Sequence, residues 1–196
     1  MIPSFHCPSC GSSIEFDAKY ARIISCKYCQ TVLEFGTGEL TIVWQQSEFI
    51  DFPSIFTVGS TIQYAGKNIF VHGLIRYEYD WWFFDVFCVE IDGKKLFIQE
   101  DDGTITFFQE SDWIDIPFEL DLSMIGKTLV VDGDNYFIQE VWVLKVVNIK
   151  GSIDSFFVPN KKYEYYDGSI EGNQIFIKRN PETKMIRLGK EVNISS

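Results

Sequence analysis

Four cysteines near the start of the chain have the spacing of metal ligands. They form two Cys-x-x-Cys pairs, Cys7 with Cys10 and Cys26 with Cys29, and residues 11–25 separate the pairs. Each pair makes a tight turn that presents two thiolates on one side, and two facing turns complete a tetrahedral four-sulfur shell. A shell of four cysteines leaves no open position for a substrate. The sequence therefore predicts one structural Zn²⁺ rather than a catalytic one, and we assign no catalytic residue and no organic cofactor to the rest of the chain.

Two other interpretations of the cysteines are possible. The pairs could form two disulfides, or one pair could be the redox motif of a thioredoxin-like fold, although no βαβ pattern surrounds either pair. His6 is adjacent to Cys7 and is interpreted as a bystander. Gly11 follows the first pair, where positive φ is often needed. Gln30 takes that place after the second pair, so the second turn is expected to be less regular.

The elements that hold the cysteines are short strands. Residues 13–25 alternate well enough for two strands, with Ile14 and Phe16 on one face, and residues 32–35 supply a third. This pattern predicts a zinc ribbon over residues 1–46, followed by a linker or docking segment over 47–55. The ribbon looks unsuited to nucleic acid, because its basic residues are outnumbered by acidic ones: Lys19, Arg22 and Lys27 against Glu15, Asp17, Glu34 and Glu39.

The remainder, residues 56–196, is expected to be an all-β domain. Aromatic residues make up 16% of the chain, and short apolar runs alternate with turn signals such as Asp92-Gly93 and Asp167-Gly168. An antiparallel β-sandwich or small β-barrel follows from this pattern. The net charge of −11 argues against nucleic acid and anionic membranes as partners. No signal peptide or membrane-spanning run is evident, so a cytoplasmic location is expected, where metal ligands are a commoner use of cysteine than disulfides.

A weak internal repeat runs through this domain. Residues 58–73 align with residues 125–140 without a gap. Five positions are identical: Gly59, Thr61, Gly66, Asn68 and Phe70 match Gly126, Thr128, Gly133, Asn135 and Phe137. Two hairpins under similar constraints would look alike, and a duplicated half-domain would also give this pattern. Both interpretations stay open.

The glycines and aromatics of this domain resemble those of a bacterial family catalogued as domain of unknown function 4178. The resemblance rests on residues 56–59, on residues 66–77, on the Trp-rich stretch 81–85 and on the acidic turn 100–103, with a looser fit from residue 165 to Lys190. The family's Trp-x-Glu-Tyr strand is matched only approximately, by residues 83–85. An N-terminal zinc ribbon is common in that family. The resemblance implies an accessory protein, in a membrane-stress or polyamine-linked system, rather than a catalyst.

Few other residues suggest chemistry. His72 lies within a strand, with Phe70 and Leu74 expected on its own face, and Cys88 is expected to be a buried, inert thiol. The carboxylates of Glu100, Asp101 and Asp102 precede Gly103 in a turn pattern, so local hydrogen bonding is expected there. The aromatic run from Tyr77 to Phe84 is interpreted as a strand buried on both faces, and an exposed tryptophan in it would mark a protein-interaction patch.

These observations predict a non-catalytic zinc-binding adaptor whose β-domain binds another protein. A nucleic-acid-binding zinc-ribbon protein is the first alternative. A hydrolase that uses turn carboxylates is the second, and it requires two carboxylates that converge in a pocket. The sequence does not identify the partner or the oligomeric state.

Overall fold

The protein's structure is a computed structural model. It describes residues 4–17, 21–46, 52–80, 82–101, 104–111, 121–131, 133–153, 161–179 and 186–194. These residues form β-strands almost throughout, together with one short 3₁₀ helix, η1 (Leu122–Met124). No helix among them is long and apolar enough to cross a membrane. The all-β prediction is therefore confirmed. Residues 47–51 of the expected linker, Trp81, Asp102 and Gly103 lie outside the described residues.

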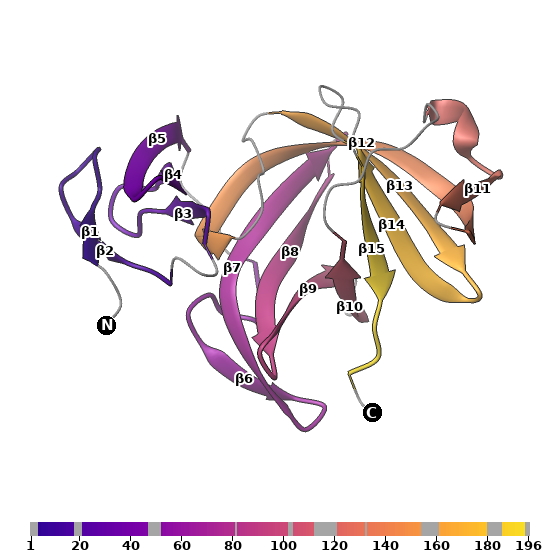
Figure 1. Ribbon diagram of the computed structural model, residues 1–196, viewed down its shortest axis with the longest axis horizontal. Coiled ribbons are helices and arrows are strands. Elements are labelled where there is room, and N and C mark those ends of the chain that lie inside the picture. Colours follow the sequence, from indigo (N-terminus) through magenta and orange to yellow (C-terminus); the bar gives the residue numbers. More distant parts are fainter. Residues whose placement is uncertain are drawn as a thin grey trace.

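Eight antiparallel strands close into a barrel (Figure 1). Each strand pairs with the next, and the last pairs back with the first. In barrel order the strands are β7 (Lys67–Tyr79), β8 (Trp82–Ile91), β9 (Lys94–Asp101), β10 (Thr104–Glu110), β15 (Ile186–Glu191), β14 (Asn173–Arg179), β13 (Lys162–Ile170) and β12 (Asp134–Ile153). Of the two architectures that the sequence allowed, the barrel is the one that forms.

The barrel interior is filled by one face of these strands. In β8, Val86 and Cys88 belong to the interior cluster, whereas Phe87 and Val89 belong to a second cluster on the outer face. Side chains alternate between the two faces of a strand, so a continuous apolar run is what a strand buried on both faces requires. Burial on both faces begins only at Val86. The expectation of one strand buried on both faces from Tyr77 to Phe84 was wrong, because β7 ends at Tyr79, β8 begins at Trp82, and Trp82 and Phe83 are exposed.

Two satellite cores cover the outer face of the barrel. One lies under β6 (Thr61–Tyr64), which pairs with the first residues of β7, and includes Ile69, Phe87 and Phe107. The other lies under β11 (Thr128–Val131), which pairs with the first residues of β12. In each case a hairpin packs its apolar residues onto the neighbouring barrel strands.

The two halves of the barrel repeat the same pattern of hydrogen bonds. The N–H of Gly59 donates to the carbonyl of Val71, and in the aligned segment the N–H of Gly126 donates to the carbonyl of Ile138. The strand pairing is interrupted by a bulge between Val71 and Gly73, and again between Ile138 and Glu140. A bulge is a specific feature of a sheet, and here it recurs at aligned positions. The sequence similarity therefore reflects a repeated structural unit.

The repeat extends to the next hairpin. Asp92 and Gly93, with φ of 51° and 76°, form the turn between β8 and β9, and Glu171 and Gly172, with φ of 49° and 87°, form the turn between β13 and β14. Two successive residues at positive φ make the tight turn that suits a twisted hairpin. These turns lie further apart in the sequence than the aligned glycines do, because β12 is longer than β7 and the connection after it is also longer.

The N-terminal ribbon adds five short strands. They are β1 (Ser4–His6), β2 (Ser13–Glu15), β3 (Ile23–Ser25), β4 (Thr31–Gly36) and β5 (Glu39–Gln45). β3 is buried on both faces: Ile24 packs in the ribbon's own core, and Ile23 packs in the barrel's interior cluster. β3 also pairs with the end of β12, so the ribbon's three-stranded sheet continues directly into the barrel (Figure 1).

Candidate metal centre

The two cysteine turns have the same backbone geometry. In the first turn the N–H of Gly11 donates to the carbonyl of Cys7 at 2.8 Å, and in the second the N–H of Gln30 donates to the carbonyl of Cys26 at 2.9 Å. Gly11 has φ of 75° and Gln30 has φ of 63°. The expectation of a less regular second turn was wrong. Gln30 accepts the left-handed conformation, which costs about 1 kcal/mol or more for a residue with a side chain.

The four sulfur atoms lie at the spacing of a tetrahedral metal shell. Cys7 Sγ is 3.7 Å from Cys29 Sγ, and Cys10 Sγ is 3.8 Å from Cys26 Sγ. All four atoms lie within 4.8 Å of one another. With Zn–S bonds of about 2.3 Å, a tetrahedron has sulfur–sulfur edges of about 3.8 Å. The cysteines are free thiols at distances too long for disulfides, and they can bind a metal ion.

The surroundings divide the thiols into two kinds. Burial raises the pKa of Cys26 to about 12 and also raises the pKa of Cys7. Burial acts in the same direction on Cys29, but hydrogen bonds with Thr31, Cys10 and Cys26 together outweigh it and lower the pKa of Cys29 to about 6. Hydrogen bonds with Ser12 lower the pKa of Cys10. Each turn thus carries one thiol that ionises readily and one that a bound cation must deprotonate.

The second turn is braced by β5. The hydroxyl of Thr31 lies 3.1 Å from Cys29 Sγ and donates to Gln45 Oε1 at 2.7 Å. Gln45 Nε2 in turn donates to the carbonyl of Cys29 at 2.9 Å. Partners of this kind fix the orientation of metal ligands. His6 is exposed in β1 and is not part of the four-sulfur group, as the sequence predicted.

The ribbon has a small core of its own. Phe5, Phe16 and Phe35 form a triangle of rings with centroids 5.1 Å apart. They pack with the buried cluster that contains Ile14, Ile24 and Leu33 and two of the cysteines. A bound metal is therefore not the ribbon's sole source of stability.

Two side-chain contacts fasten the ribbon to the barrel. The N–H of Gly151 donates to Ser25 Oγ at 3.0 Å. The buried amide of Gln46 pairs with the backbone of Ile149 on both sides: its Nε2 donates to the carbonyl at 2.7 Å, and its Oε1 accepts from the N–H at 2.9 Å. Gln46 therefore extends the sheet at a point where the strand ladder has ended.

The remaining sequence candidates do not assemble into a catalytic site in the described part of the chain. His72 Nε2 lies 3.3 Å from Glu90 Oε2, and Phe70 packs edge-on against its ring. Leu74 does not share its face, because the bulge at His72 turns Leu74 toward the outer core with Val71. Cys88 is buried in the barrel interior, as expected.

The carboxylates are held by partners from other segments, so the expectation of local hydrogen bonding in a turn was wrong for Glu100, which lies in β9. Arg76 clamps Asp85 with two hydrogen bonds of 2.7 Å, and Ser54 donates to Glu100. A cavity of about 160 Å³ lies beside this pair, and Asp85 is the one acid among its described lining residues. The hydrolase alternative requires two carboxylates that converge in a pocket. The described residues that line this cavity supply only one.

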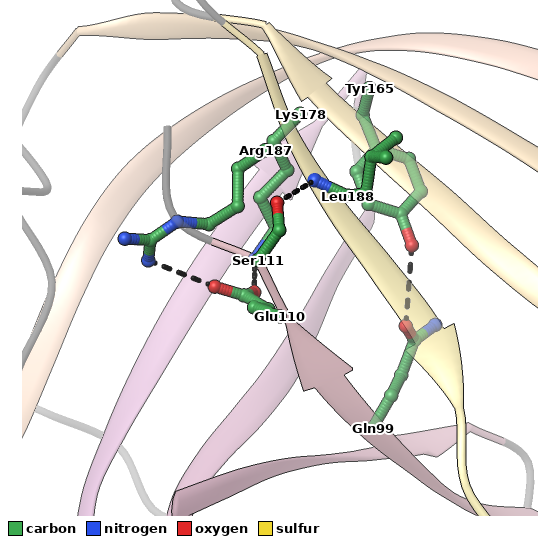
Figure 2. Close-up of polar contacts among 7 residues, drawn as sticks. All are labelled: Gln99, Glu110, Ser111, Tyr165, Lys178, Arg187 and Leu188. Atoms are coloured by element: carbon green, nitrogen blue, oxygen red, sulfur yellow. Dashed lines mark hydrogen bonds and ion pairs between the residues drawn. The ribbon is translucent and has the colours of Figure 1, made fainter. Parts of the chain in front are cut away.

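The structure reveals a buried ionic cluster that sequence reasoning missed. Glu110 accepts from Lys178 Nζ at 2.6 Å and from Arg187 Nη1 at 3.0 Å (Figure 2). The Lys178 and Glu110 side chains are each 2% exposed. The Lys178 ammonium also lies over the rings of Tyr77 and Phe176, at 5.3 and 4.6 Å from their centroids. The sequence held one signal of this cluster. Lys178 is two residues from Phe176 in a strand pattern, so the two side chains share a face, and an apolar face would carry Lys178 inward.

Comparison of the chain with models of known protein families, with curated proteins and with solved structures found no match. Membership of the family that the sequence resembles stays a prediction.

Proposed function

We propose that the four cysteines hold one structural Zn²⁺ and that the chain is a non-catalytic accessory protein whose barrel binds another protein. The donor set supports zinc, because four thiolates at tetrahedral spacing suit this ion. It also supports a structural role, because the shell is complete without a water molecule or a substrate. By this proposal the metal stabilises the ribbon, and the ribbon's sheet braces the barrel.

The observation that carries the binding role is an exposed aromatic surface. It consists of Phe52 and Phe83, which are 46% and 45% exposed, and of Trp82, which is 62% exposed, precedes Phe83 at the start of β8 and points to the other face of the strand; we call these three residues the aromatic rim. The Phe52 and Phe83 rings lie 4.7 Å apart, and the Arg76 guanidinium lies over both. Large aromatic side chains left in water are typical of protein-interaction sites.

The repeated half of the barrel serves as an internal control for this surface. Phe83 lies opposite Glu78, and at the corresponding pair of the second half Lys162 lies opposite Lys145. The residue that precedes Lys162 is Lys161, at the place of Trp82. The same strands thus form with lysines at these positions. The fold does not require the aromatic residues of the rim, which supports a role in binding.

The experiment compares three forms of the full-length, zinc-loaded protein as bait in an extract of the native host. The test variant is Trp82→Lys/Phe83→Lys, which carries the residue type of the other half and is expected to fold. The control variant is Val130→Lys/Phe137→Lys, which alters side chains that are 57% and 44% exposed on β11 and β12. A protein retained by the wild type and the control but lost by the test variant supports the proposal. Equal retention by all three contradicts it.

The same proposal places the protein in the cytoplasm and in a membrane-stress or polyamine-linked system. Their support is the sequence alone, through the use of cysteine and the family resemblance. Nucleic acid is not favoured, because the described ribbon carries Arg22 and Lys27 against four acidic residues. Failure to bind heparin at moderate salt is the expected result.

A further inference from the structure

A row of four residues crosses the outer face of the barrel where its two halves meet. Lys162 of β13 lies opposite Lys145 of β12, Lys145 lies opposite Glu78 of β7, and Glu78 lies opposite Phe83 of β8. Residues directly opposite in antiparallel strands place their side chains side by side on one face. Lys162, Glu78 and Phe83 are exposed and Lys145 is half-buried, so this row faces outward.

The order of the row makes it complementary to itself. It reads lysine, lysine, glutamate, phenylalanine, and neighbouring strands are about 4.8 Å apart. A second copy turned by a twofold axis parallel to the strands, midway between Lys145 and Glu78, presents the row in reverse. Lys145 then faces Glu78 of the other copy, and Lys162 faces the ring of Phe83. An ion pair and a cation–π contact each form twice.

We propose that the partner bound at the aromatic rim is a second copy of this chain, joined through this row in a closed twofold dimer. This inference rests on the proposed function, because Phe83 belongs to both the row and the rim. The contact adds a second cation to the Phe83 ring, which is 45% exposed in the single chain.

The charges of the row are available for such a contact. Although Glu78 and Lys145 lie directly opposite each other, neither takes part in an ion pair among the described residues. The row also holds two cations and one anion in a fixed order. A uniformly basic or uniformly acidic partner would meet a like charge on one side of it, whereas a second copy matches both sides.

The test is sedimentation equilibrium of the full-length, zinc-loaded protein from micromolar to sub-millimolar concentration. Wild-type protein is expected to show a concentration-dependent monomer–dimer equilibrium. Glu78→Lys sets lysine against Lys145 of the other copy, and Lys145→Glu sets glutamate against Glu78. Each variant alone is expected to weaken the dimer at least about tenfold in Kd. Circular dichroism on each variant checks that it stays folded.

Mixing the two single variants gives the sharpest result. In the mixture the lysine introduced at position 78 of one chain faces the glutamate introduced at position 145 of the other. The native Lys145 of the first chain also faces the native Glu78 of the second, so both pairs are restored between chains. Equal amounts of the two variants are therefore expected to form a heterodimer with a Kd close to the wild-type value. Phe137→Ala, which removes a ring 44% exposed elsewhere on the barrel, is expected to change nothing.

Three outcomes overturn the inference. They are a wild-type protein that stays monomeric, a dimer that neither single variant weakens, and a mixture that does not re-associate. None of them decides the proposed function, because the rim is tested separately by the extract experiment. A monomeric wild type that retains a protein at the rim would show that the partner is a different molecule.

Discussion

Glu78 and Lys145 lie opposite each other where β7 pairs with β12, and Lys145 is the residue that corresponds to Glu78 in the second half of the barrel. The other junction has the same property. Phe108 of β10 pairs with Phe97 as Gly189 of β15 pairs with the corresponding Phe176, so the next residues, Gln109 and Lys190, also correspond, and they lie opposite each other. Equivalent residues meet at both junctions. The barrel thus has an approximate twofold axis through its wall, and each half can serve as a control for the other.

Loss of one metal ligand should separate the two parts of the molecule. Cys26→Ser is expected to release the zinc and unfold the ribbon, since three thiolates bind the ion less tightly and metal binding contributes folding free energy. The barrel is expected to stay folded. Metal analysis combined with limited proteolysis tests this. Cys88→Ser, which changes the buried cysteine outside the cluster, should keep a full equivalent of metal. Collapse of both parts together would contradict the two-domain division.

The amide of Gln46 should stabilise the junction between ribbon and barrel. Gln46→Ala leaves the N–H and the carbonyl of Ile149 without their partner in a buried position, and each unsatisfied group costs about 1–3 kcal/mol. The free energy of unfolding, measured by urea titration, is expected to fall by about 2 kcal/mol or more. Gln63→Ala on the exposed side of β6 is the matched control and should have little effect. Equal stability of the two variants would show that the contact is not needed.

Gly189 is required by the ring that lies against it. A methyl group there would overlap the Phe176 ring, which is packed in the barrel interior and cannot move away freely. Gly189→Ala is expected to destabilise the barrel by about 1–3 kcal/mol, the usual cost of overpacking. Gly36→Ala offers a control at a strand position with nothing within 4 Å and no positive φ. The midpoints of denaturant unfolding would compare them, and an unaffected Gly189→Ala would refute the packing argument.

The buried pair of Lys178 and Glu110 should show strong coupling. Lys178→Met leaves the Glu110 carboxylate with fewer partners at a site that is 2% exposed, and breaking a buried pair costs about 3–5 kcal/mol. Adding Glu110→Gln removes the stranded charge, so the double variant should lose less than the sum of the single losses. Lys67→Met breaks the exposed pair with Asp92 and should matter little. Additive losses at Lys178 and Glu110 would contradict the coupling.

Local chemistry in the sequence determined much of the ribbon and the class of the fold. The cysteine spacing predicts the four-sulfur cluster, since each turn is formed by neighbouring residues and needs no distant partner. The period-two pattern with its glycine turns predicts antiparallel strands for the same reason. The repeat was visible as five matching residues, yet only the shared bulges and hydrogen bonds show that it is a structural unit.

The pairing of strands that are distant in the sequence is seen only in the tertiary structure. Nothing local shows that β12 pairs with β7 to close a barrel, or that it also receives the ribbon at β3. The inward position of Lys178 and the outward position of Phe83 follow from closure, because a strand pattern fixes which residues share a face but not which face becomes the interior. Gln30 was misjudged for a local reason: the tight cysteine turn imposed positive φ on a residue whose own preference is against it.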